Sequence, residues 1–420
     1  MTDHSQAPHA LIVGAGIVGL YTALYLRQAG WRVQIIDRGE PGMACSAGNA
    51  GALSSASVAP LGMPGVVRQA PRMLLDPSGP LSVPPHYWLT AAPWLLRFIQ
   101  ASSPQKVTAI SLALKQLLDQ AIVCHQNSMK QLGHNDLINL TGQLHVYPNE
   151  QAAAKDSGGW ALRRQHGVKV ETLDHGQIHD LEPDVGAHYQ VGYFMPDQGM
   201  VVNPLRQSQS IAAALASWGV EFLQDEVLSL QREGQRIVGV RCRQGEHKVS
   251  RVIVCAGAWS AQLLKDLGYR VPLETQRGYH LTLANSGITL SRPVVAADRK
   301  IFVTPMETGL RLAGTVEFGG LERPPTQRRL EPLLQYGKLL LPELNTASEA
   351  QSWMGHRPCL PDSLPVLGPV QAIEGLWLNF GHGHLGLTMS AVSGKLLSQA
   401  MQGQTPDISL APYAVERFTP

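Results

Sequence analysis

The chain has 420 residues, of which 44% are hydrophobic and 16% are charged, and its formal net charge is +2. This length predicts two or more structural units with a sizeable core, and this composition excludes a disordered chain. The even balance of charges gives no electrostatic reason to expect a nucleic-acid partner.

The start of the chain predicts a β–α–β unit. Residues 9–13 form an apolar strand, and a glycine loop and an apolar-periodic helix ending at Gly30 follow. Residues 31–36 then form a second strand. The next residues, 39–65, are rich in Gly, Ala, Ser and Pro and predict a long loop, and the many prolines of 60–104 predict irregular structure.

Helices and strands alternate along the rest of the chain. The sequence predicts helices over 106–132, 151–166, 204–218, 260–267, 328–341 and 390–401. It predicts strands over 143–147, 168–172, 193–195, 200–202, 221–230, 236–243, 248–255, 278–283, 300–306, 309–315 and 376–380.

This order predicts an α/β (α+β) fold with a discontinuous Rossmann-like nucleotide domain. Its segments are 8–60, 198–265 and 352–412. Residues 61–197 and 266–351 would form a substrate domain with a mixed or antiparallel sheet.

The strongest motif is the glycine fingerprint that follows the first strand. Gly14 allows a tight turn, Gly16 lets a pyrophosphate approach the backbone, and Gly19 lets the helix pack closely on the strand. Asp37 ends the second strand, where a carboxylate binds a ribose hydroxyl; this disfavours NADP but does not separate NAD from FAD. The cofactor-binding candidates of this unit are Gly14, Ala15, Gly16, Ile17, Val18, Gly19, Asp37 and Arg38.

Two further segments of small residues predict close approach of the backbone to a flat ring. One is 45–51, and the other is 379–388, where backbone N–H groups at a helix start could face flavin O2 and N1. Their candidates are Ser46, Asn49, Ala50, Gly51, Gly381, His382, Gly383, Leu385, Gly386 and Thr388. His382 and His384 are two residues apart with no nearby partner, and no CxxC pair occurs, so we predict no metal and no disulfide framework.

Together with segments 254–260 and 355–365, these motifs resemble the D-amino acid oxidase/dehydrogenase superfamily of FAD enzymes, also called the glycine oxidase type. They are most similar to the small catalytic subunit of bacterial D-amino acid dehydrogenases. The resemblance implies non-covalent FAD that also contacts Val227, Gly257 and Trp259. It implies that Arg357 pairs with the substrate carboxylate, that Tyr279 helps to hold the carboxylate or closes the pocket, and that His384 belongs to the same catalytic group.

The resemblance implies an enzyme that oxidises the Cα–N bond of a neutral D-amino acid, or of D-proline or hydroxy-D-proline. Hydride would pass to flavin N5, and the electrons would go to a quinone or another non-oxygen acceptor, as in the dehydrogenases whose proline-rich stretch resembles 57–65. Four alternatives stay open: an oxygen-using oxidase of glycine- or sarcosine-type amines, a flavin subunit of a hetero-oligomeric dehydrogenase, an oxidase of amines without a carboxylate, and an NAD enzyme.

The sequence gives no stretch of about 18 uninterrupted apolar residues, so we expect no membrane-spanning helix. Residues 88–99 are apolar and aromatic and predict either a buried or interface helix or a membrane-surface contact that gives access to quinone. We therefore expect a cytoplasmic protein, with peripheral attachment to the inner face of the cell membrane and oligomerisation as open alternatives.

Overall fold

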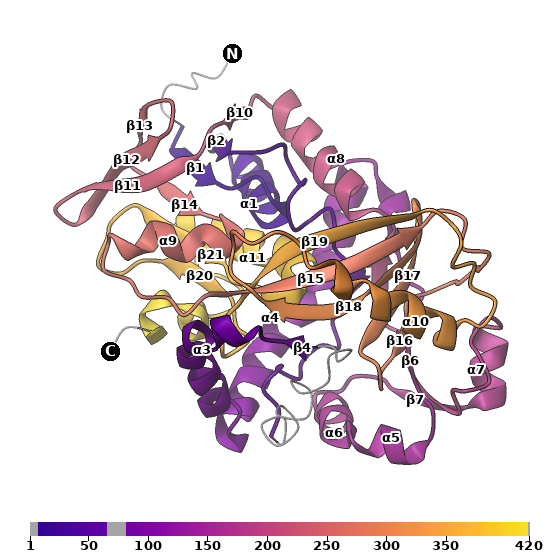
Figure 1. Ribbon diagram of the computed structural model, residues 1–420. Coiled ribbons are helices and arrows are strands. Elements are labelled where there is room, and N and C mark those ends of the chain that lie inside the picture. Colours follow the sequence, from indigo (N-terminus) through magenta and orange to yellow (C-terminus); the bar gives the residue numbers. More distant parts are fainter. Residues whose placement is uncertain (1–6, 65–80, 419–420) are drawn as a thin grey trace.

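The computed structural model describes residues 7–64 and 81–418, which fold into two adjoining units, each built on a sheet (Figure 1). The first sheet has the order β10 (Glu221–Gln224), β2 (Arg32–Asp37), β1 (His9–Val13), β14 (Val252–Val254), β21 (Leu376–Phe380) and β20 (Val366–Pro369). All neighbours are parallel except β20, which pairs antiparallel with β21. This sheet confirms the predicted Rossmann-like unit, assembled from both ends and the middle of the chain.

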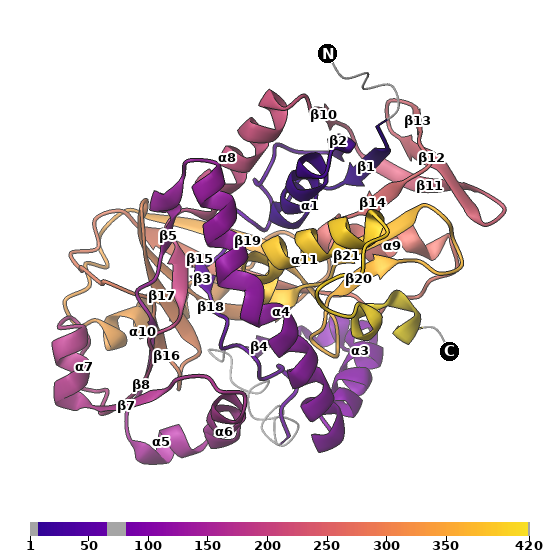
Figure 2. The same ribbon diagram turned by 180° about the vertical axis from the view of Figure 1, so that it is seen from behind.

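Helices cover this parallel sheet and share its core. They are α1 (Ile17–Gln28), α4 (Pro104–Gln131), α8 (Pro204–Ser217) and α11 (Gly386–Met401), which gather on one side in Figure 2. The buried His125 of α4 ties them together: its ring bonds to the Tyr21 hydroxyl of α1, to Gln207 of α8 and to the Leu387 carbonyl of α11. Because these partners are buried, each lost bond would leave an unpaired polar group.

The second unit is built on a larger sheet, in which strands pair both parallel and antiparallel. Its order is β19 (Ala350–Cys359), β15 (Glu274–Leu283), β18 (Gly309–Phe318), β17 (Ile301–Met306), β16 (Val294–Ala296), β6 (Gln143–Tyr147), β8 (Val191–Met195) and β7 (Glu171–Asp174), and β4 (Leu81–Ser82) pairs with β18. Peripheral helices are α5 (Glu150–Ala154), α6 (Ser157–Gln165), α7 (His175–Leu181) and α10 (Glu331–Leu340).

Two small sheets and two further helices complete the fold. One sheet consists of β11 (Val227–Glu233), β12 (Arg236–Cys242) and β13 (Glu246–Lys248), and the other of β3 (Ala52–Leu53), β9 (Gly199–Val201) and β5 (Ile138–Asn139). The helices are α3 (Trp88–Ala101) and α9 (Ser260–Lys265).

The structure shifts the domain boundaries predicted from the sequence. β19, which begins at Ala350, pairs along its whole length with β15 and so belongs to the second sheet, although 352–412 was assigned to the nucleotide domain. Conversely, α4 lies within the predicted substrate segment 61–197 but packs on α11 and α1. Pattern alone could not place either element, because both would bury an apolar face in either unit.

Several predicted elements differ in detail from the observed ones. The stretch 60–104 contains the regular helix α3 despite Pro93, so irregular structure was wrong for its second half, while 65–80 lie outside the described residues. The predicted helix 151–166 is broken into α5 and α6 at Lys155 and Asp156. The strand predicted over 168–172 begins only at Glu171, and the short helix α7, capped by Asp174 and Gln177, was missed.

Among the described helices, only α4 is long and apolar enough to cross a membrane. The sequence did not predict this, because polar residues interrupt the apolar stretches of α4. Half of its most apolar window is buried inside the molecule. Leu114, Leu117 and Leu118 lie in the core that α1 and α11 share. Its burial is that of a core helix.

The closest approach between α1 and α11 generates a prediction about stability. A Cβ atom on Gly394 would lie 2.8 Å from the Tyr21 carbonyl carbon, which cannot move without shifting α1. We expect Gly394→Ala to destabilise the fold by about 1–3 kcal/mol, because the core is overpacked. Thermal unfolding followed by circular dichroism measures this. The control is Gly176→Ala in α7, where the added methyl makes only an ordinary 3.4 Å contact; equal melting temperatures for both variants would contradict the prediction.

Candidate functional site

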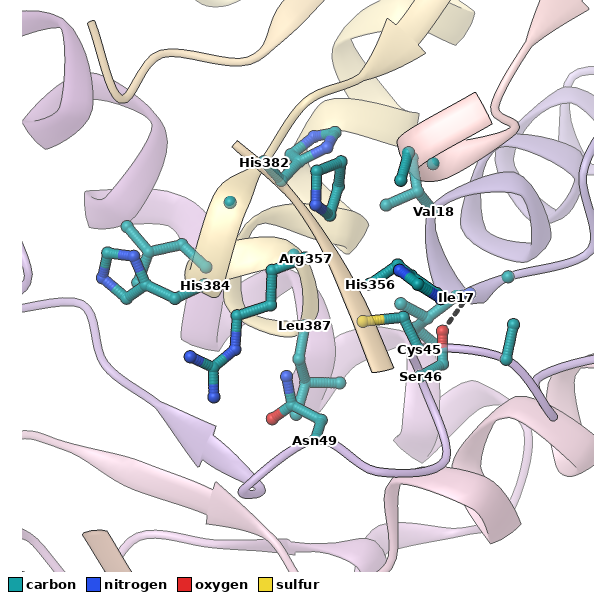
Figure 3. Close-up of a pocket in the computed structure, with 18 of the residues that line it drawn as sticks. Ile17, Val18, Cys45, Ser46, Asn49, His356, Arg357, His382, His384 and Leu387 are labelled. Atoms are coloured by element: carbon teal, nitrogen blue, oxygen red, sulfur yellow. Dashed lines mark hydrogen bonds between the residues drawn. The ribbon is translucent and has the colours of Figure 1, made fainter. Parts of the chain in front are cut away.

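A cavity of about 730 Å³ is lined by both units and contains most of the residues that the sequence singled out. At one end lie the start of α1 and the carboxyl ends of β1 and β2, and at the other end lie residues of β6, β15, β18 and β19. This volume falls within the range of about 300–1,000 Å³ that is typical of small-molecule sites. Figure 3 shows the central part of the cavity.

The glycine fingerprint lines one end of the cavity, which we call the nucleotide end after the prediction from the sequence. Gly14 has a φ of 113°, which only glycine adopts without strain, and it makes the turn from β1 into the loop before α1. The Asp37 carboxylate accepts hydrogen bonds from the backbone N–H groups of Ala15 (2.7 Å) and Gly39 (2.9 Å), so it holds the loop against the end of β2. The first turn of α1 carries no acidic side chain, which leaves its N-terminus suited to an anion.

Aromatic and basic side chains form one wall beside this loop. The Arg38 guanidinium lies 4.0 Å from the centre of the Trp259 ring, and the Trp259 ring meets His356 edge to face. His356 is held by the Thr275 hydroxyl at 2.9 Å. Trp259 therefore packs between the two units, with one face covered by a cation.

The segment 46–51 crosses the middle of the cavity and is fixed from both units. The Ser46 hydroxyl accepts a hydrogen bond from the Ile17 N–H at 2.9 Å, drawn as a dashed line in Figure 3. From β18, Arg311 donates to the carbonyls of Ala47 and Asn49. From β15, the His280 ring bonds to the Gly48 carbonyl at 3.0 Å, and it stacks on Trp353 of β19. The sequence analysis missed Arg311 and Trp353 because their partners are distant in sequence.

Arg357 lies in the middle of the cavity without a protein partner. In Figure 3 its side chain extends into the space between His384 and Asn49. Within the described residues it forms no hydrogen bond or ion pair. Its guanidinium lies across the backbone of Gly278, where a Cβ atom would be 2.6 Å from the guanidinium carbon. Gly278, another residue that the sequence did not single out, thus provides the space in which Arg357 lies.

Tyr279 lines the cavity, but its hydroxyl is already bonded. It donates to Glu317 at 2.6 Å and accepts from the Thr326 N–H at 3.1 Å. His280, the next residue along β15, also lines the cavity, although alternation along a strand predicts that it faces the opposite side. This geometry favours Tyr279 as part of the wall rather than as a residue that holds a ligand through its hydroxyl.

The second glycine segment forms the turn between β21 and α11. The His382 ring is buried and bonds to the Ser393 hydroxyl, so this side chain serves the core, and His382 also lines the cavity. The His384 ring opens onto the cavity; burial, together with Arg357 and Arg163, lowers its pKa to about 4. Thr388 links α11 to β3 by donating to the Ala52 carbonyl.

Most sequence-predicted residues therefore meet in this cavity. Those that line it are Gly14, Gly16, Ile17, Val18, Asp37, Arg38, Ser46, Asn49, Ala50, Val227, Gly257, Trp259, Tyr279, Arg357, Gly381, His382, Gly383, His384, Leu385, Gly386 and Thr388. Ala15, Gly19 and Gly51 do not line it. Gly19 packs on the Gly14 carbonyl, and the Gly51 N–H donates to the Asn49 side chain.

One group of metal-ligand types occurs near the nucleotide end, but we assign no metal to it. Ligand atoms of Asp225, Cys242 and His247 lie within 4.8 Å of one another. Both Asp225 oxygens already accept backbone hydrogen bonds, from Glu226 and Gln244, and burial raises the pKa of the Cys242 thiol to about 11. All five cysteines are free.

Comparisons with known proteins agree on one family. The model of the DAO family, described as FAD dependent oxidoreductase, matches residues 9–400. A D-amino-acid oxidase of Bradyrhizobium diazoefficiens is 36% identical over 98% of this chain and 99% of its own length. A glycine oxidase of Pseudomonas aeruginosa is 31% identical over 97% and 99%. The crystal structure of glycine oxidase from Geobacillus kaustophilus superposes with a TM-score of 0.78 over 98% and 99% at 21% identity.

The buried histidines predict loss of stability in acid. Burial lowers the pKa of His382 to about 3 and, with Arg311, that of His280 to about 3; it lowers that of His125 to about 4. The unfolded chain binds these protons near pH ~6.5, so below that pH it takes up more protons than the native state. Stability should therefore fall from about pH 6.5 down to about pH 3, where the native histidines also become protonated.

Thermal unfolding at several pH values measures this fall. His125→Gln should lower stability at neutral pH but make the pH dependence shallower, because one buried neutral histidine is gone. The exposed His179→Gln is the control. A melting temperature that stays constant between pH 7 and pH 4.5 would contradict the prediction.

Proposed function

Because the chain belongs to the DAO family of FAD-dependent oxidoreductases, we propose that it oxidises the Cα–N bond of a D-amino acid whose carboxylate binds Arg357. The observation that carries this proposal is the unpaired Arg357 guanidinium inside the cavity. A guanidinium presents two parallel N–H donors that match a carboxylate. The D configuration rests on the resemblance and on the name of the Bradyrhizobium relative.

The residues at the nucleotide end fit the FAD that the family binds. Gly14 and Gly16 keep side chains away from the start of α1, where the pyrophosphate would lie, and Asp37 would face a ribose. The segment 46–51 and the turn 381–386 would supply backbone contacts to the ring system. FAD, when bound, accepts the two electrons and the hydrogen that leave the substrate.

At the substrate end, the chain binds and orients rather than donates or removes protons. Arg357 would fix the carboxylate, and the low pKa of His384 keeps that ring neutral at physiological pH. The carboxylates that line the cavity, namely Asp37, Asp225 and Glu226, come from the nucleotide end in the described part of the chain. We therefore assign no side chain as a general base; positioning of the Cα–H bond carries the chemistry. The imine product would hydrolyse to a 2-keto acid and ammonia, or stay cyclic for a proline-type substrate.

Oxygen is the acceptor that the relatives favour. The sequence analysis expected a quinone or another non-oxygen acceptor, with oxygen as the alternative. The two relatives described above, at 36% and 31% identity, are named oxidases, one for D-amino acids and one for glycine. We therefore propose an oxidase. A dehydrogenase is the second candidate, and the exposed apolar face of α3 supports it.

The proposed activity is tested by mixing the purified protein anaerobically with D- and L-amino acids, proline analogues and sarcosine. We expect a flavin spectrum that bleaches with D-amino acids and recovers quickly in air. Bleaching only with L-amino acids, only with amines that lack a carboxylate, or with no compound would contradict the proposal. Recovery that needs an added quinone would favour the second candidate.

Arg357 and Gly278 together generate a mutational prediction. Arg357→Met should lower kcat/KM for D-amino acids by an amount equivalent to about 2–5 kcal/mol, because the carboxylate loses a charge-assisted pair. Gly278→Ala should raise KM by roughly 10-fold or more, because its methyl group displaces the guanidinium. Steady-state kinetics at matched flavin content measure both.

The double variant Arg357→Met, Gly278→Ala shows whether Gly278 acts only by leaving space for the Arg357 side chain. If Gly278 acts only through Arg357, Gly278→Ala should change little in the Arg357→Met background. Full additivity of the two losses would show that Gly278 acts in another way. Unchanged kinetics of Arg357→Met would contradict the role of this arginine.

The second candidate is a dehydrogenase that delivers electrons to a membrane quinone, and the surface of α3 favours it. Leu89 is 90% exposed and Leu96 61% exposed, and they lie seven residues apart on one face of the helix. Trp88 and Ile99 are also exposed. Apolar side chains that gather on one exposed helix face are typical of membrane-surface contacts.

Vesicle binding tests this surface. If α3 contacts a membrane, the protein should sediment with vesicles of phosphatidylcholine and phosphatidylglycerol, and the Leu89→Glu, Leu96→Glu double variant should lose this binding. Val123→Glu on the exposed face of α4 is the matched control, since Val123 is 54% exposed. Absence of sedimentation of the unmodified protein would exclude the α3 contact and remove the support for this candidate.

A further inference from the structure

Positive charge accumulates at the substrate end of the cavity. The cationic side chains that line this end are Arg163, Lys300 and Arg357. Lys300 is neutralised by Asp156, whose carboxylate lies 2.9 Å from the ammonium group. Arg357 is assigned to the α-carboxylate of the substrate. Among the described residues, Arg163 is then the cation of this end that has neither an ion pair nor an assigned ligand, although Asp156, which pairs with Lys300, also attracts it electrostatically.

Arg163 is held in place by an aromatic ring rather than by a hydrogen bond. It projects from α6, and its guanidinium lies 4.7 Å from the centre of the Trp160 ring. The Trp160 indole is itself fixed by the Tyr147 hydroxyl at 2.8 Å. The Nε of Arg163 is buried without a hydrogen-bond partner, and the described residues contain no ion pair to this arginine.

Two of the cavity-lining groups near Arg163, His145 and Gln143, are neutral and polar, whereas Asp156 adds a negative charge that it shares with Lys300. His145 meets the Trp160 ring edge to face and bonds to Gln143 at 2.8 Å, and both line the cavity. Burial lowers the pKa of His145 far below its usual value, and Arg163 lowers it further. Arg163 and Arg357 both depress the pKa of His384, which places that ring within electrostatic reach of the two guanidinium groups.

We infer that Arg163 is a second substrate contact, which binds a hydrogen-bond-accepting oxygen, a hydroxyl or a carboxylate, on the side chain of the amino acid. This inference rests on the proposed function and adds the class of substrate. Arg357 would hold the α-carboxylate at one end, and Arg163 would hold the side-chain oxygen at the other.

A substrate with a purely aliphatic side chain does not match the polar surroundings of Arg163. An alkyl group would cover the half-buried Arg163 guanidinium and leave this cation without a hydrogen-bonding partner, which is costly. An oxygen acceptor would instead bond to it directly. Among the substrates that the sequence suggested, hydroxy-D-proline keeps such an oxygen, whereas D-proline and simple neutral D-amino acids do not.

Paired substrates test the inference on the flavin-loaded protein. One pair is D-proline and cis-4-hydroxy-D-proline, which differ by a hydroxyl, and the other is D-norvaline and D-glutamate, which differ by a carboxylate. We expect kcat/KM to be at least ~10-fold higher for the oxygen-bearing member of one pair, because a site built for an oxygen rejects the analogue that lacks it. The pair that shows the preference identifies the oxygen as a hydroxyl or a carboxylate.

The variants Arg163→Met and Arg163→Lys then connect the preference to this side chain. Arg163→Met should remove the preference, mainly by lowering kcat/KM for the oxygen-bearing member of the pair, and Arg163→Lys should retain part of the preference. The matched control is Arg164→Met, which removes the neighbouring exposed arginine outside the cavity and should leave the preference unchanged. Flavin content and melting temperature show that each variant is folded.

The possible failures are distinguishable. If D-amino acids reduce the flavin but neither pair shows a preference, or if the preference survives in Arg163→Met, the inference is wrong and the proposed function stands. If no amino acid reduces the flavin, both are wrong.

Discussion

The attachment of the segment 46–51 to both units is the constraint on which the whole site depends. Ser46 bonds to the first turn of α1, whereas Arg311 and His280 hold the same segment from the second sheet. Neither sheet alone encloses a ligand, because each contributes only one side of the cavity. This short segment therefore sets the spacing between the nucleotide end, where glycines and Asp37 lie, and the substrate end, where the arginines lie.

The acidic side chains that line the cavity in the described part of the chain all lie near the fingerprint loop, beside the cation Arg38. The acidic lining residues come from the ends of β2 and β10, where a ribose would be bound, whereas Arg163 and Arg357 come from α6 and β19. Glycine at 278 provides the space for one guanidinium, and an indole ring supports the other. The proposed oxidation of an amino acid beside FAD therefore depends on where these two cations are held.

The sequence predicted the parts of the site that depend on local backbone geometry. It did not predict the parts that depend on contacts between residues far apart in the sequence. The fingerprint 14–19, Asp37 and the turn 381–386 act through tight turns and helix starts, which glycine spacing reveals. Arg311, Trp353 and Gly278 act through residues that are distant in sequence. Tyr279 and His280 both line the cavity, which simple alternation along β15 does not predict. Arg163 lies in a polar helix near the surface, where an arginine carries no pattern of its own. The placement of β19 and α4 was missed for the same reason, since each pairs or packs across the boundary between the units.

The most direct measurement of the central claim is equilibrium binding of a carboxylate that lacks an amino group and cannot be oxidised, such as propionate, followed by the change in flavin absorbance. The account predicts a saturable change in the unmodified protein and, in Arg357→Met, a dissociation constant raised by roughly 30-fold or more, equivalent to at least about 2 kcal/mol. Equal affinity of both proteins for propionate, at equal flavin content, would contradict the assignment of Arg357 to the substrate carboxylate.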